Sequence, residues 1–168
     1  MEELRVESTA DFQRLQIIDV EQLYILDKNL KFEYEKKQIL KSEWEESIKS
    51  NLDNGAKIVI IKKNSQIIMY FIFMEDTEYN NVYIKNLNID ENYQSNLFLM
   101  KKLSLLLVEI FINSRLPYLR FSVHKGNEYS INMYRKFKFK ELLNIENNNF
   151  VTFEVTREDL IKNKLVRV

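Results

Sequence analysis

The sequence predicts an α+β fold of three layers (α/β/α), in which helices cover both faces of a mixed, mostly antiparallel sheet with one parallel pair of strands. Three runs rich in Ile, Val, Tyr and Phe, at 57–62, 66–74 and 82–89, are joined by polar turns, which is typical of an antiparallel meander. A long apolar helix, 97–113, then leads to a strand at 118–123. Because a strand–helix–strand crossover normally makes a parallel pair, these two strands are predicted to be parallel.

The residues before the meander predict a short strand and a first helix. The strand covers 4–7, and Ser8 and Thr9 can cap the helix that follows. Apolar residues from Phe12 to Leu23 follow helical spacing loosely.

A second helix is predicted to begin at Ser42, because Glu45 follows three residues later in a capping-box pattern. Gly55 stands where the C-terminus of a helix favours a residue that can take a positive φ.

The last third of the chain predicts a helix, a hairpin and a terminal helix. The helix covers 127–136, and the hairpin strands cover 140–145 and 150–155. Thr156 and Asp159 suit the cap of a short last helix.

Composition limits the classes of function. A chain of 168 residues is long enough for one globular domain, 1–168, with a sizeable core. Its 25 basic and 25 acidic residues balance, so no global field favours nucleic acid or an anionic membrane as a partner. The absence of cysteine excludes disulfides and a cysteine nucleophile, and no His, Asp and Glu residues have the spacing of metal ligands.

No signal-peptide pattern occurs at the N-terminus, and the most apolar window, 97–112, is too short and too charged to span a bilayer. We therefore expect a cytoplasmic location. Basic residues from Arg135 to Lys140 alternate with Phe137 and Phe139, which favours an apolar-in, basic-out pattern over a nucleic-acid surface.

The segment 123–139 is the most informative part of the chain. It combines the end of an apolar strand, an asparagine, a small residue, a Met-Tyr pair and a phenylalanine after a basic stretch. These residues are Val123, Asn127, Ser130, Met133, Tyr134 and Phe139. This pattern, together with the order of elements over 4–155, resembles the GNAT superfamily of acyl-CoA-dependent N-acyltransferases. Lys138 stands where that family usually has glycine.

The resemblance implies a role for two residues of this segment. Asn127 would contact the pantetheine arm of the acyl donor, and Tyr134 would protonate the departing thiolate. A phenol can supply that proton without being charged beforehand. The alternative is that Tyr134 simply packs with Met133 and Phe137 between helix and sheet, and the residues alone leave both possibilities open.

A second segment, 87–99, corresponds to the family's pyrophosphate loop, Arg/Gln-x-x-Gly-x-Gly/Ala. Amides at a helix N-terminus hold the phosphates there, and glycine lets them approach the backbone closely. Gln94 keeps the first position, but Leu97 and Leu99 replace the two small residues, which predicts a poor fit for a pyrophosphate. The resemblance implies that the donor is held by Asn127 and by Leu87, Ile89, Gln94, Ser95, Asn96, Leu97 and Leu99.

The general base is poorly specified by the sequence. The strand 82–89 carries no acid. His124, the only histidine, lies at the end of the 118–123 strand, and its ordinary pKa suits proton removal from an ammonium group. The carboxylates flanking the 82–89 strand are the other candidates. They are Glu75, Asp76, Asp90 and Glu91.

The resemblance therefore implies transfer of an acyl group from acetyl-CoA, or another acyl thioester, to the amine of a small molecule or peptide. The acyl group would pass directly to the amine, with Tyr134 and His124 as catalytic residues and no metal. Two alternatives remain open. One is a catalytically inactive protein of the same fold that acts as a binding or regulatory module, and the other is a donor carried on an acyl-carrier protein. A homodimer would be common for this fold.

Overall fold

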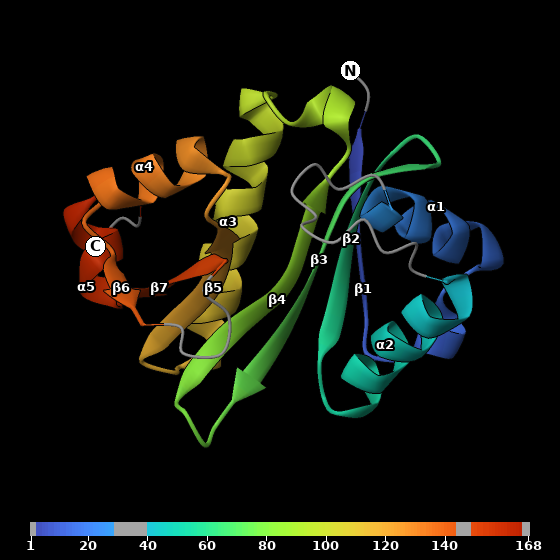
Figure 1. Cartoon of the computed structure of the whole chain (residues 1–168), viewed down its shortest axis with the longest axis horizontal. Helices are drawn as coiled ribbons and strands as arrows, with labels where there is room; N and C mark the ends of the chain where they lie inside the picture. The colour runs from blue at the N-terminus through green and yellow to red at the C-terminus, as the bar shows by residue number, and fades with distance from the viewer. Residues whose placement is uncertain (1–2, 29–39, 144–148, 166–168) are drawn as a thin grey trace. The chain divides into compact units, whose positions relative to one another are not determined.

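The computed structural model describes residues 3–28, 40–143 and 149–165, which contain a seven-stranded sheet in the order β1-β2-β3-β4-β5-β7-β6 (Figure 1). The strands are β1 (Leu4–Thr9), β2 (Lys57–Lys63), β3 (Gln66–Asp76), β4 (Asn81–Ile89), β5 (Tyr118–His124), β6 (Lys140–Leu142) and β7 (Phe150–Val155). The helices are α1 (Ile17–Lys28), α2 (Lys41–Asp53), α3 (Leu97–Ser114), α4 (Glu128–Lys136) and α5 (Arg157–Lys162), with short 3-10 helices η1 (Phe12–Arg14) and η2 (Glu91–Tyr93).

The pairing of the strands confirms the predicted fold class. β4 and β5 are parallel, with Val82 opposite Leu119. β1 pairs with β2, β2 with β3, and β7 with both β5 and β6, in each case antiparallel. The chain therefore has the mixed, mostly antiparallel sheet of an α+β protein, and α3 is the crossover between the parallel strands.

Residue contacts divide the chain into two compact units. The first consists of Met1–Met74 and Asn86–Met100, and the second of Glu75–Lys85 and Lys101–Val168. The expectation of a single domain stays a prediction.

The core of the first unit forms where α1 and α2 pack against β2 and β3. Residues 58–62 and 67–73 are buried without interruption, as expected for central strands. Leu23 of α1 and Trp44 of α2 belong to the same buried cluster as these strands, and the two helices lie side by side (Figure 1). Gly55, with φ of 98°, makes the predicted turn after α2.

The predicted start of the first helix was wrong. Ser8 and Thr9 do not cap a helix, because both lie in β1, opposite Val59 and Ile58 of β2. Asp11 caps η1 instead, accepting the N–H of Gln13 at 3.0 Å, and α1 begins only at Ile17.

The predicted cap of the second helix was also wrong. α2 begins at Lys41, so Ser42 lies inside it, and its N-cap residue, Leu40, makes no side-chain cap. Lys41 instead forms ion pairs with Glu21 of α1 and with Glu45 in its own helix.

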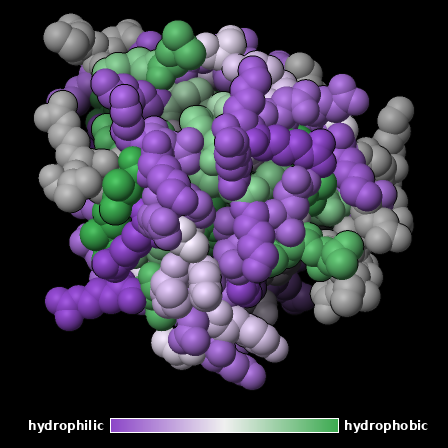
Figure 2. All heavy atoms as spheres, turned by 90° about the vertical axis from the view of Figure 1, so that its left-hand side faces the viewer, coloured by the Kyte–Doolittle hydropathy of each residue, from purple (hydrophilic) through white to green (hydrophobic). Residues whose placement is uncertain are grey.

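The second unit has an aromatic core between α4 and the β5–β7 pair. Phe121 of β5 and Phe153 of β7 pack against each other, and Tyr134 of α4 packs against both. Phe139 is buried, whereas Lys138 and Lys140 on either side of it are exposed, as the alternation predicted. The side of the molecule carrying α4 and α5 shows mainly hydrophilic side chains with scattered hydrophobic ones (Figure 2).

The C-terminal predictions had mixed outcomes. Thr156 and Asp159 form the expected capping box of α5. β6 ends at Leu142, so it is shorter than the predicted strand 140–145, and residues 144–148 of the hairpin lie outside the described residues.

Candidate functional site

The predicted site residues of the first unit lie at the end of β4, in the following loop and at the start of α3. The loop is held by its own polar groups. The carboxylate of Asp90 accepts the N–H of Asn92 at 2.9 Å, and the N–H of Asp90 donates to the carbonyl of Ile68 in β3 at 2.8 Å. The side chain of Gln94 donates to the carbonyl of Ile89 at 3.3 Å. The loop therefore reaches α3 without a glycine.

Asn96 caps the start of α3. Its side-chain oxygen accepts the N–H of Leu99 and its carbonyl accepts the N–H of Met100, both at 3.0 Å. The first four amides of a helix ordinarily lack partners within the helix. Here they belong to residues 96–99, and two of them are engaged: the N–H of Asn96 donates to the carbonyl of Tyr93 at 3.0 Å, and the N–H of Leu99 donates to the side chain of Asn96. The side chain of Leu97 is 84% exposed and that of Phe98 is 70% exposed.

The two leucines of the predicted pyrophosphate loop therefore behave differently. Leu99 is only 1% exposed and packs in the core, whereas Leu97 points to solvent. The sequence predicted both side chains at the mouth of the site, but the helix directs that of Leu99 into the core.

A buried polar cluster lies in the same unit, centred on the carboxylate of Asp27 in α1. It accepts the hydroxyl of Tyr70 at 2.5 Å, the indole N–H of Trp44 at 2.6 Å and the side-chain amide of Asn88 at 3.2 Å. Asn88 also donates to the carbonyl of Leu26 at 2.7 Å. Burial, followed by the charge of Asp27, raises the pKa of Tyr70 well above its usual value. The cluster thus ties α1 and α2 to β3 and to the end of β4.

Sequence reasoning missed this cluster. A signal for it existed, because Asp27 lies seven residues after Val20 and four after Leu23, on the buried face of α1. A carboxylate on such a face requires several hydrogen-bond donors. The donors come from three other elements, and the sequence alone does not say which.

In the second unit, His124 ends β5 and orders the turn into α4. Its Nδ1 accepts the N–H of Gly126 at 2.8 Å, its carbonyl accepts the N–H of Asn127 at 2.9 Å, and its ring lies edge-on to Phe150. The side chain is buried, and this burial lowers the pKa of His124. The ring is therefore neutral near pH 7, and because Nδ1 accepts, its proton lies on Nε2.

Asn127 is the N-cap of α4, and its side-chain oxygen accepts the N–H of Ser130 at 3.3 Å. Its side-chain N–H groups are the part that can serve a ligand. The structure therefore joins two of the predicted residues, His124 and Asn127, through a backbone hydrogen bond in one turn.

Tyr134 lies further along α4 in an aromatic environment. Its ring meets that of Phe121 edge-on at 4.8 Å between centroids, that of Phe153 at 5.2 Å and that of Phe139 at 6.3 Å. Burial raises the pKa of Tyr134, so the phenol keeps its proton at neutral pH. Packing and proton donation are compatible, because the ring can pack while the hydroxyl serves a ligand.

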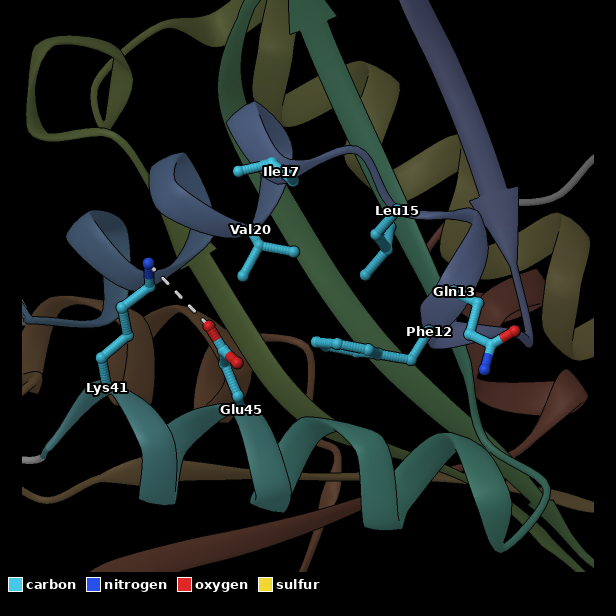
Figure 3. A pocket seen from close by; sticks show the side chains of 7 residues that line it. All are labelled: Phe12, Gln13, Leu15, Ile17, Val20, Lys41 and Glu45. Atoms are coloured by element: carbon cyan, nitrogen blue, oxygen red, sulfur yellow. Dashed lines mark ion pairs between the residues drawn. The ribbon is translucent and has the colours of Figure 1, made fainter.

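A hollow of about 350 Å³ lies elsewhere in the first unit, between η1, α1 and α2 (Figure 3). The side chains of Phe12, Leu15 and Val20 point into it, and Lys41 and Glu45 pair at its rim (Figure 3). None of its lining residues is among the predicted site residues.

Within 3–28, 40–143 and 149–165, no group of three or more His, Asp or Glu side chains could hold a metal ion. None of the described helices has the length and the hydropathy needed to cross a membrane.

Comparison with known proteins gives matches at the level of structure. No family model matches the sequence, and none of the curated proteins matches it. An acetyltransferase from Streptococcus agalactiae 2603 superimposes with a TM-score of 0.70 at 13% identity, over 91% of this chain and 98% of that one.

Two further solved structures are similar to this chain. The spermidine/spermine N-acetyltransferase SpeG from Vibrio cholerae has a TM-score of 0.64 at 15% identity, covering 95% of this chain and 96% of its own. The N-acetyltransferase PseH from Campylobacter jejuni, in complex with acetyl coenzyme A, has a TM-score of 0.60 at 16% identity, covering 92% and 99%. The chain therefore has the fold of the GNAT N-acetyltransferases.

Proposed function

We propose that this chain is an N-acyltransferase that moves an acyl group from a pantetheine thioester, such as acetyl-CoA, directly to a primary amine. The observation that carries the proposal is the position of Tyr134, a partly buried phenol that keeps its proton on the helix after β5 of an N-acetyltransferase fold. The similar protein from Vibrio cholerae is named as a spermidine/spermine N-acetyltransferase, which supports an amine acceptor. The similar protein from Campylobacter jejuni is in complex with acetyl coenzyme A, which supports a thioester donor.

In the proposed reaction, the nitrogen of the neutral amine attacks the thioester carbonyl. The carbon–sulfur bond then breaks, and the departing thiolate takes the proton of the Tyr134 hydroxyl, giving a free thiol and an amide. The proton released by the amine goes to a base, and bulk solvent restores the phenol.

We assign the proton-accepting role to His124. Its lowered pKa keeps the ring in the neutral form that a base requires. Its Nδ1 lone pair is engaged with the N–H of Gly126, so the role requires that this hydrogen bond open when the acceptor binds. Asn127, through its side-chain N–H groups, would hold the amide groups of the pantetheine arm.

The remaining assignments concern the donor, the acceptor and the assembly. The donor would lie along the end of β4 and the loop that follows, with Leu87, Ile89 and 94–99 as its contacts. A small molecule or a peptide supplies the amine. A homodimer and a cytoplasmic location stay predictions. Neither the structure nor the comparisons contain an observation that favours an inactive binding module.

The proposal is tested by thiol release with acetyl-CoA over a panel of amines that includes spermidine. We expect turnover by the wild type, and a loss of about 100-fold or more in kcat for Tyr134→Phe. Tyr129→Phe is the matched control, because Tyr129 lies on the same helix but is 82% exposed. Equal activity of the wild type and Tyr134→Phe would refute the role of the phenol, and no turnover with any acyl thioester would refute the function.

A further inference from the structure

The start of α3 is poorly built to hold a pyrophosphate. Such a group needs several unengaged amides at a helix N-terminus and close access to the backbone. Of the first four amides of α3, that of Leu99 donates to the side chain of Asn96 and that of Asn96 donates to the carbonyl of Tyr93, which leaves at most those of Leu97 and Phe98. These two residues carry large, exposed apolar side chains instead of the hydrogen of a glycine.

The charges around this loop disfavour an anion as well. The segment Asn86–Met100 contains Asp90 and Glu91 and no Lys or Arg. Lys63 reaches the loop, with its ammonium group 5.6 Å from the ring centroid of Tyr93. The next cations along the chain, Lys101 and its neighbour, come only after the first turn of α3. Two carboxylates thus precede the helix end that a doubly negative group would approach.

The same surface suits a different part of the donor. Leu97 and Phe98 present large apolar side chains at the start of α3, and Leu87, near the end of β4 in the same unit, is also exposed. The arm of the donor offers methyl and methylene groups on either side of its amides, which such a surface can cover. A pyrophosphate at the same place would lose hydration without gaining compensating donors.

We infer that the donor is recognised through its acyl-phosphopantetheine arm and not through a nucleotide pyrophosphate. This inference rests on the proposed function and names the donor class of that same site. The arm exists in two forms, as a free small molecule or attached to a carrier protein. Either form carries the thioester that the reaction consumes.

Calorimetric titration of the full chain with CoA and with 4′-phosphopantetheine tests the inference without requiring catalysis. We expect the two affinities to agree within about threefold. If the protein bound the pyrophosphate, which 4′-phosphopantetheine lacks, each charge-assisted hydrogen bond to it would raise the affinity for CoA about tenfold or more. Binding of CoA about tenfold or more tighter than the truncated arm would overturn the inference. Failure of both to bind at millimolar concentration would overturn it too.

A third titration distinguishes the two sources. A carrier protein with the phosphopantetheine arm attached is compared with the same protein without the arm. Tighter binding of the loaded carrier than of the free arm assigns a carrier-bound donor, and equal or weaker binding assigns a small-molecule donor. Both outcomes support recognition of the arm.

A double variant and its control test whether the Asn96 cap and the Leu97 side chain prevent pyrophosphate binding. Asn96→Gly/Leu97→Gly removes the cap and the branched side chain, so CoA should gain at least about tenfold in affinity relative to 4′-phosphopantetheine. Leu105→Gly is the control, because Leu105 lies on the same helix and is 57% exposed but is remote from its start. An unchanged or lower preference for CoA in the double variant would overturn the inference. Thiol release measured in parallel separates the two proposals, because binding of the arm without turnover contradicts only the proposed function.

Discussion

The hydroxyl oxygen of Tyr70 lies 2.5 Å from each carboxylate oxygen of Asp27, which joins β3 to the last turn of α1 inside the first unit. Both side chains are buried. The carboxylate is satisfied by neutral donors, so its charge is stabilised by hydrogen bonds. The stability of this unit should therefore depend on the pair.

Asp27→Ala should lower the free energy of unfolding by about 3 kcal/mol, because it leaves three buried donors without their acceptor. Tyr70→Phe should cost about 1–2 kcal/mol. Urea denaturation of both variants and of the double variant measures the coupling, which we expect to reach at least about 1 kcal/mol. Asp53→Ala, at an exposed aspartate of α2, is the control, with an effect within about 0.5 kcal/mol. Strict additivity of the two single effects would show that the pair is not coupled.

His124 should make the protein less stable in acid. Burial lowers its pKa, so the unfolded chain takes up a proton near pH 6.5 while the folded chain still holds the neutral ring. This contribution is present above about pH 6.5 and is lost as the pH falls through the folded-state pKa.

His124→Asn provides the test, because an asparagine oxygen can still accept the N–H of Gly126 but does not titrate. Urea unfolding at about pH 5 and about pH 8 should show a smaller acid loss for the variant than for the wild type. Equal losses would mean that this ring does not contribute to the acid dependence.

Lys138 holds a backbone conformation that favours glycine. Its φ is 57°, and it is the residue that stands where the GNAT pattern usually has glycine. A left-handed conformation costs an L-residue about 1–2 kcal/mol, partly offset in a glycine variant by the larger entropy of its unfolded chain. Lys138→Gly should therefore raise the free energy of unfolding by about 0.5 kcal/mol. Lys136→Gly, in the last turn of α4, should lower it by about 0.5–1 kcal/mol. Destabilisation by both glycines would contradict the strain at Lys138.

Much of the fold could be predicted because local patterns decide it. The uninterrupted apolar runs of β2 and β3 are typical of buried strands, and α3 between β4 and β5 predicts the parallel pair. The start of the first helix could not be predicted, since Ser8 and Thr9 are equally suited to a cap and to a strand. Both residues lie in a strand because they pair with β2, which is far along the chain.

In the predicted site, too, features that depend on local pattern could be predicted and features that depend on tertiary contacts could not. Asn127 and Tyr134 could be placed together from the sequence, because they lie at the N-cap and inside one short helix with a recognisable pattern, and their roles stay predictions. The opposite orientations of Leu97 and Leu99 depend on the residue at which α3 begins, and the sequence does not fix a helix boundary to one residue. The Asp27 cluster was missed because its donors come from α2, β3 and β4, which only the tertiary structure brings together.

The leaving group provides the most direct test of acid catalysis by Tyr134. The kcat/KM of the wild type and of Tyr134→Phe is measured with an alkyl thioester, acetyl-pantetheine, and with an aryl thioester, whose thiolate leaves without needing a proton. The variant should lose about 100-fold with the alkyl donor and less than about fivefold with the aryl donor, because only the first depends on the phenol. An equal loss with both donors would contradict proton donation and would leave Tyr134 as a packing residue.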